Sequence, residues 1–184
     1  AAGTYLWARG FGGTGNDGGS CVAVDASGGV FVAGHFGGSV NFGGGPLLSA
    51  GGDDVFVAKY SAIDGAHLWS KRFGGTGSDG ATGVALDAAG NVFVTGSFSS
   101  ISIDFGGGPL ASAGFDDIFV VKFSPTGVHS WSNSFGGSGI DVGSALAVDG
   151  VGDVVATGSF EGMANFGGVT LVSAGALDVF LAKY

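Results

Sequence analysis

The three tryptophans of this chain, Trp7, Trp69 and Trp131, stand at equal intervals of 62 residues. Four residues after each comes a phenylalanine that opens a glycine-rich run, FGGTGND, FGGTGSD or FGGSGID. Aligned on the first two tryptophans, residues 7–34 and 69–96 are identical at 17 of 28 positions. A fixed period of this length indicates tandem copies of one supersecondary unit. We divide the chain into three copies, residues 1–68, 69–130 and 131–184.

Four short segments in each copy have the composition of β-strands, rich in valine, phenylalanine and alanine and separated by clusters of Gly, Asp or Ser. The first segment carries the tryptophan and covers residues 5–11, 67–73 and 129–135. The second covers residues 21–25, 83–87 and 145–149. The third covers residues 30–36, 92–98 and 154–160, and the fourth covers residues 55–60, 118–123 and 179–184. The second to fourth segments are apolar at successive positions, which indicates sheets that are buried on both faces.

Glycine accounts for 41 of the 184 residues, which argues against helices because a glycine inside a helix costs about 1 kcal/mol relative to alanine. The chain is nevertheless 45% hydrophobic and contains 16 phenylalanines, so a packed core is expected rather than disorder. The glycines follow no three-residue period and only three prolines occur, which excludes collagen. An all-β, turn-rich fold remains.

The charge balance limits the partners of the chain. With a formal net charge of −9 and no basic cluster, the counterion release that drives nucleic-acid binding has no surface to act through. No apolar run approaches the roughly 20 residues of a membrane helix. We therefore expect neither nucleic-acid binding nor membrane insertion. Cys21 is the single cysteine, so no intrachain disulfide is expected.

The connections between segments favour a propeller. The runs DASGG, DAAGN and DGVGD predict tight hairpins in which glycine supplies a positive φ. The stretch at residues 100–114 predicts an additional outer hairpin in each copy, and this explains why the repeat is longer than a WD40 or kelch blade. We predict three β-propeller blades, each with four core strands and this extra hairpin. A parallel β-helix is the structural alternative, but its rungs are much shorter.

The runs GGTGSDGATGVALDAAGNVFVTGSF and DDVFVAKY resemble the bacterial seven-bladed β-propeller repeat family SBBP. The similarity extends over all three copies. The resemblance implies a propeller in a secreted or cell-surface bacterial protein, often beside other adhesive or repeat modules, and it brings no catalytic residue. The third copy departs from the pattern, with Val155 where the others have phenylalanine and Leu177 where they have aspartate.

The order of the segments bears on assembly. If the resemblance holds, the chain begins with the outermost strand of a blade and ends with the third strand of one, so one blade is split between the two ends of a single propeller unit. Three blades cannot close a ring, because each would have to span about 120° while packed sheets stay closer to alignment.

An open sheet edge recruits another strand. We therefore predict head-to-tail pairing of residues 5–11 with residues 179–184 of a second copy, giving a six-bladed dimer, a nine-bladed trimer or a filament. If the chain is part of a longer array, the missing blades lie in the same polypeptide. The predicted edge residues are Tyr5, Trp7, Phe11, Val179, Phe180 and Tyr184.

The runs GGTGND, GGTGSD and GGSGID match the first six positions of the calcium-binding nonapeptide GGxGxDxUx. In that motif successive turns stack and share carboxylates, whereas here the turns are 62 residues apart. Glycine or alanine also stands where the motif needs a large apolar residue. We interpret the aspartates as turn residues that accept backbone N–H bonds, with no metal and no cofactor. The calcium alternative rests on Asp17, Asp79 and Asp141.

The other repeated charges also have structural interpretations. The aspartates that end the second segment are explained by the turns that follow; they are Asp25, Asp87 and Asp149. The doublets at residues 53–54 and 116–117 point to opposite faces of an extended strand, so they are badly placed as an acid/base pair. A lysine recurs in the apolar fourth segment, and we expect it to pair with a repeated aspartate or to reach solvent. These lysines are Lys59, Lys122 and Lys183.

No catalytic residue is predicted. The three histidines have no metal-ligand spacing, and no Ser/His/Asp arrangement can be singled out. Cys21 is expected to be a buried, inert thiol.

The tryptophans have two interpretations, core packing between blades or ligand pockets for sugar rings, and we favour packing; the candidates are Trp7, Trp69 and Trp131. We predict a non-enzymatic scaffold or adhesion module that self-assembles. A propeller lectin that binds glycans at repeated sites is the first alternative, and a propeller hydrolase is the second.

Overall fold

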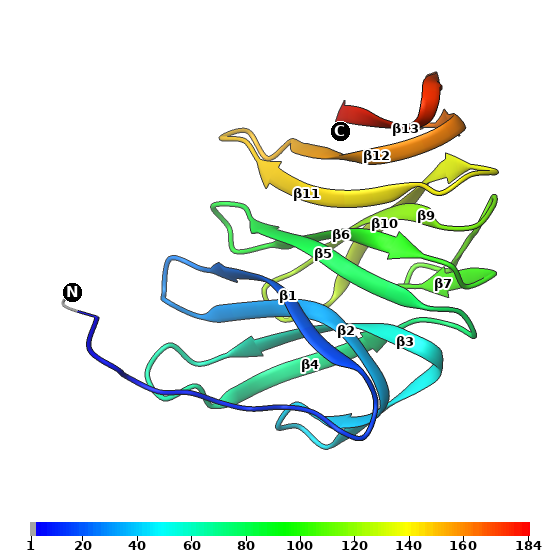
Figure 1. The fold of residues 1–184 in the computed structure, drawn as a ribbon. Helices are drawn as coiled ribbons and strands as arrows, with labels where there is room; N and C mark the ends of the chain where they lie inside the picture. Colours follow the sequence, from blue (N-terminus) through cyan, green and yellow to red (C-terminus); the bar gives the residue numbers. More distant parts are fainter. Residues whose placement is uncertain (1–2) are drawn as a thin grey trace.

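Antiparallel β-strands make up the regular structure of residues 3–184, the part of the chain that the computed structural model describes (Figure 1). Among these residues there is no helix, and hence none long and apolar enough to cross a membrane. The strands are β1 (Asp17–Val24), β2 (Val30–Asn41), β3 (Pro46–Tyr60), β4 (His67–Phe73), β5 (Asp79–Leu86), β6 (Val92–Phe98), β7 (Ser102–Asp104), β8 (Pro109–Ala111), β9 (Asp117–Phe123), β10 (His129–Gly137), β11 (Val142–Val148), β12 (Val154–Asn165) and β13 (Thr170–Lys183).

The strands form three layers that are stacked one on another along the chain (Figure 1). The first layer has the order β1-β2-β3-β4, and the second has the order β5-β6-β9-β10. The third layer contains β11, β12 and β13. A short ladder between Gly136 and Asn165 and between Gly137 and Ala164 joins the second layer to the third. The all-β prediction is therefore confirmed.

Most predicted strands are present in the structure, and many begin earlier or end later than the segments predicted from the sequence. Strands β1, β5 and β11 begin before the predicted segments, and each contains a bulge near its start. Residues 5–11 are the exception: they were expected to be a strand, and they form none. A β-strand exists through its ladder partner, and no strand of the described chain pairs with this segment.

The predicted extra hairpin is present between residues 100 and 114, where β7 pairs with β8. In the other two layers the same hairpin continues β2 into β3 and β12 into β13. The hairpin contributes to the hydrophobic core, because the phenylalanine at its turn is buried. These phenylalanines are Phe42, Phe105 and Phe166, at 3%, 2% and 5% exposure.

Glycine is required at two kinds of position. In the hairpins after β1, β5 and β11 the turn glycines Gly28, Gly90 and Gly152 have φ of 84°, 78° and 94°, as predicted. In the middle of β6, a Cβ on Gly96 would lie 2.0 Å from the carbonyl oxygen of Gly80 on β5. The two backbones approach too closely there for any side chain.

The hydrophobic core lies between the layers. One cluster joins the first layer, through Phe31 and Val57, to the second layer, through Phe119. Another joins the second layer, through Ile118, to the third layer, through Phe160. Strands β6 and β9 of the middle layer are buried on both faces, in agreement with the successive apolar positions of the sequence. The layers therefore stabilise one another mainly through face-to-face burial of apolar side chains.

Candidate functional site

The aspartate of each GGxGxD run closes its own turn. Asp79 Oδ2 accepts a hydrogen bond from Gly75 N at 2.9 Å, and its Oδ1 accepts one from Ser100 N at 3.1 Å. Asp17 and Asp141 accept the corresponding bonds. These are the contacts of the turn interpretation. No group of three or more metal-ligating side chains occurs in residues 3–184. The calcium alternative stays an untested prediction.

The second aspartate of each doublet is buried or holds the end of a hairpin. Asp54 is fully buried, accepts from Ala50 N at 2.9 Å and forms an ion pair with Arg72. Burial raises its pKa, and Arg72 opposes this shift. Within the described chain, its Oδ1 is the one buried side-chain oxygen or nitrogen without a hydrogen-bond partner. Arg72 has no counterpart in the other copies, where glycine (Gly10) and serine (Ser134) occupy the position.

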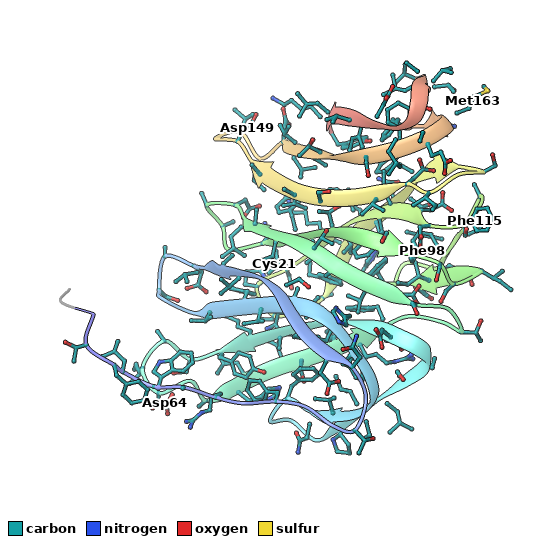
Figure 2. The ribbon with its side chains drawn as sticks, viewed as in Figure 1. Cys21, Asp64, Phe98, Phe115, Asp149 and Met163 are labelled. Atoms are coloured by element: carbon teal, nitrogen blue, oxygen red, sulfur yellow. The ribbon has the colours of Figure 1, made fainter. Side chains whose placement is uncertain are left out.

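The repeated lysines meet the repeated aspartates, as predicted. Lys Nζ and Asp Oδ2 are 3.0 Å apart for Lys59 and Asp25, 3.4 Å for Lys122 and Asp87, and 2.7 Å for Lys183 and Asp149. The aspartate sits at the hairpin tip of its layer, as Figure 2 shows for Asp149. The Ser27 hydroxyl and Lys59 hold the pKa of Asp25 well below its usual range. Lys183 lowers the pKa of Asp149 to about 2. The pairs fix the hairpin tips of the three layers.

The histidines and the cysteine show no catalytic arrangement. His67 Nε2 and His129 Nε2 each lie 3.0 Å from a serine hydroxyl three residues ahead. No histidine nitrogen in the described residues makes a hydrogen bond to a carboxylate. Cys21 lies partly buried in the first layer (Figure 2). Burial raises the pKa of its thiol to about 11, so it is protonated at neutral pH.

Two of the tryptophans bind neighbouring turns through their indole nitrogens. Trp69 of the first layer donates its Nε1–H to the carbonyl of Pro125 in the second layer at 3.2 Å. Trp7 donates to the carbonyl of Ala62 in the first layer at 3.1 Å. The ring of Trp69 also lies edge-on to Phe31, with centroids 6.0 Å apart. These contacts favour the packing interpretation, because they engage both the ring and the polar group of the indole.

Residues 5–11 lie where the outermost strand of a preceding layer would lie. Phe11 stacks on Tyr60 of the first layer, with centroids 5.1 Å apart. Phe73 of β4 stacks on Phe123 of the second layer in the same way, at 5.2 Å. The Trp7 bond to the first layer likewise repeats the Trp69 bond to the second. Residues 5–11 thus contact the first layer in the same way as β4 contacts the second layer, but they have no strand to pair with in the described chain.

The third layer is open at the corresponding place. The outer edge of β3 is paired with β4, and that of β9 is paired with β10. In the described chain β13 pairs only with β12. Val179 and Leu181 of β13 are 80% and 74% exposed. At the same positions, the valines and isoleucine of the other layers are at most 1% exposed; they are Val55, Val57, Ile118 and Val120. Within residues 3–184, the third layer therefore has an unpaired edge and an uncovered apolar face.

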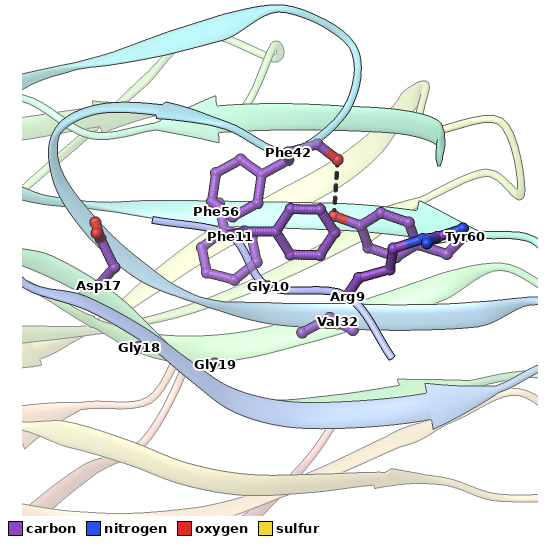
Figure 3. Close-up of a pocket in the computed structure, with 10 residues that line it drawn as sticks. All are labelled: Arg9, Gly10, Phe11, Asp17, Gly18, Gly19, Val32, Phe42, Phe56 and Tyr60. Atoms are coloured by element: carbon purple, nitrogen blue, oxygen red, sulfur yellow. Dashed lines mark hydrogen bonds between the residues drawn. The ribbon is translucent and has the colours of Figure 1, made fainter. Parts of the chain in front are cut away.

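The first layer carries a pocket of about 290 Å³ under residues 9–11 (Figure 3). Its apolar wall contains the rings of Phe11, Phe56 and Tyr60, and Tyr60 donates its hydroxyl to the carbonyl of Phe42 at 3.1 Å. Burial raises the pKa of Tyr60 to about 12. The pocket floor includes Gly19 of β1. Our reading of the sequence missed this pocket, and the absence of a side chain at Gly19 is the signal that points to it.

Two comparisons with known proteins bear on the fold. Over 216 aligned positions, covering 97% of this chain, it is 27% identical to an uncharacterized WD repeat-containing protein of Acanthamoeba polyphaga mimivirus. The chain spans 16% of the length of that protein. The family model of the β-propeller repeat SBBP matches residues 68–97, which contain most of β4, all of β5 and most of β6. The predicted resemblance is confirmed for residues 68–97, which match the SBBP β-propeller repeat.

Proposed function

We propose that this chain is a non-enzymatic β-propeller scaffold or adhesion module that assembles head to tail. In this proposal each layer is one propeller blade, and the chain supplies three of them. The free edge of β13 carries the proposal, because the equivalent edges of β3 and β9 are each paired with a tryptophan-bearing strand. An uncovered ladder edge in an apolar strand favours pairing with another chain.

The missing strand is present in the sequence. Residues 5–11 align with β4 and β10, and in the described chain they lie extended on the first layer without a ladder. In the β3–β4 ladder, Phe73 faces Val55, Trp69 faces Lys59 and His67 faces Tyr60. The same register pairs Phe11 with Val179, Trp7 with Lys183 and Tyr5 with Tyr184 of a second copy. Two copies would complete six blades, three would complete nine, and an open rotation would give a filament.

The chemistry of the described residues supports a binding role rather than catalysis. The repeated carboxylates are engaged in turns or with lysines, and the cysteine is protonated. From the family resemblance we propose that the protein acts outside the cell or at the bacterial cell surface.

Native mass measurement over a range of protein concentrations tests the proposal. We expect a closed dimer or trimer, or a ladder of higher species, at micromolar concentration. Replacing Val179, whose N–H points away from β12, by proline removes a donor from the free edge and is expected to shift the distribution toward monomer. A stable monomer throughout the concentration range would contradict head-to-tail assembly.

A further inference from the structure

Within residues 3–184, the first and third layers each have one apolar face that no other layer covers. On β13 this face consists of Val179 and Leu181, which are 80% and 74% exposed. On β1 it consists of Val22 and Val24, which are 64% and 61% exposed. The residues equivalent to Val22 and Val24 in the other layers pack against the core of the preceding layer. These equivalents are Val84 and Leu86 on β5 and Leu146 and Val148 on β11.

The internal contacts show how two such faces fit. Ile118 of the second layer packs directly on Gly143 of the third, since a Cβ built on Gly143 would lie 3.1 Å from Ile118 Cγ2. Val179 has the position of Ile118 one layer later, and Gly19 has the position of Gly143 on β1. Around Gly19 the space is open, because a Cβ there would meet only Val32 Cγ1, at 3.6 Å. The pocket of the first layer therefore lies where side chains of a preceding layer would insert.

The position of residues 5–11 fixes the orientation of such a layer. Through Trp7 and Phe11 this segment already makes the contacts of an outermost strand on the first layer. A β13 strand that pairs with it in the β3–β4 register would bring Val179 and Leu181 over the pocket. Edge pairing and face packing are thus satisfied by one placement.

We propose that the pocket formed by Gly19, Phe11 and Phe56 receives Val179 and Leu181 from a second copy of this chain. The third layer of one molecule then packs on the first layer of the next with the geometry of the internal layer contacts. The inference rests on the proposed head-to-tail assembly and adds the side chains that give it register and specificity. A second copy is the occupant that fits, because the two faces continue a packing already present twice within the chain.

One variant on each face tests the docking. Leu181→Asp places a charge in the apolar contact and is expected to weaken association by about 100-fold or more. Its matched control is Val172→Asp on the same strand. Val172 is 67% exposed. Leu48 holds the same position in the first layer and is still 66% exposed, although the second layer packs on β3 of that layer. A side chain at this position therefore stays outside the contact between layers. The control is expected to associate like the wild type.

On the receiving face, Gly19→Leu fills the pocket from a position whose backbone is not left-handed, so the layer itself is expected to fold. We expect association to weaken by about tenfold or more, because the incoming side chains lose their apolar contact. Gly19→Ala is the conservative control, since alanine (Ala81) stands at the equivalent position of the second layer. It is expected to leave association within about threefold of the wild type.

Sedimentation velocity of each variant, alone and in an equimolar mixture, completes the test. Each of the two docking variants retains one intact face, so the mixture is expected to form mainly a dimer, while each variant alone shifts toward monomer relative to the wild type. If Leu181→Asp and Gly19→Leu assemble as well as their controls while the wild type is oligomeric, the docking inference is wrong and strand pairing alone accounts for assembly. A monomeric wild type at all concentrations overturns the docking inference and the proposed function together.

Discussion

Replacing Trp69 by alanine tests whether the tryptophans hold adjacent layers together. The substitution removes the Nε1 bond to Pro125, for which a net contribution of about 1 kcal/mol is typical. It also removes the edge contact with Phe31, worth about 1 kcal/mol, and the apolar burial of a half-buried indole. We expect a total loss of about 3 kcal/mol in the free energy of unfolding. For a chain of this size that corresponds to a decrease in Tm of about 6–12 °C.

Thermal unfolding followed by circular dichroism measures the effect, with Trp69→Phe as the matched control. Phenylalanine keeps an aromatic ring beside Phe31 but loses the N–H donor and part of the buried ring area, so we expect a smaller decrease in Tm, of about 2–6 °C. An unchanged Tm for Trp69→Ala would refute the packing argument. If that variant also lost binding to a panel of immobilised sugars, Trp69 would belong to a carbohydrate site.

Three further outcomes follow from the geometry. Gly96→Ala is expected to lower the Tm by several degrees, because the new Cβ would lie 2.0 Å from the Gly80 carbonyl oxygen. Gly80→Ala is the control and should leave the Tm unchanged, because the nearest atom to its Cβ is 3.8 Å away. Equal Tm values for the two variants would contradict the backbone contact. The rate of Cys21 alkylation should keep rising with pH up to about 11, and a plateau near pH 9 would show an unperturbed thiol. The depressed pKa of Asp25 stabilises the fold above about pH 4, and this stabilisation is lost as the pH falls through the folded pKa. Asp25→Asn should therefore lower the Tm at pH 7 and differ less from the wild type at pH 2; a constant difference would count against the Lys59–Asp25 pair.

The sequence predicted those parts of the fold that depend on local pattern. The 62-residue repeat and the glycine turns located most strands and the hairpins, because strand composition and positive φ are local properties. Residues 5–11 were predicted as a strand on the same pattern, and the structure differs because a ladder also needs a partner at its edge.

Contacts between residues far apart in the sequence were harder to predict. The Arg72–Asp54 ion pair joins two adjacent strands of the first layer and has no equivalent in the other layers, so the repeat alignment gives no sign of it. The pocket at Gly19 is lined by residues that lie far apart in the sequence, from Arg9 to Tyr60, so no single segment reveals its shape.

Each hydrophobic cluster that spans layers is shared by two neighbouring layers, and none spans all three. Stability then accumulates approximately as a sum over layers and nearest-neighbour contacts. The middle layer, with β6 and β9 covered on both faces, has two such contacts, and each outer layer has one. Opening is therefore expected to begin at the outer layers and to spare the middle one. An array of this kind lengthens by adding a layer at an outer face, and the existing contacts need no rearrangement.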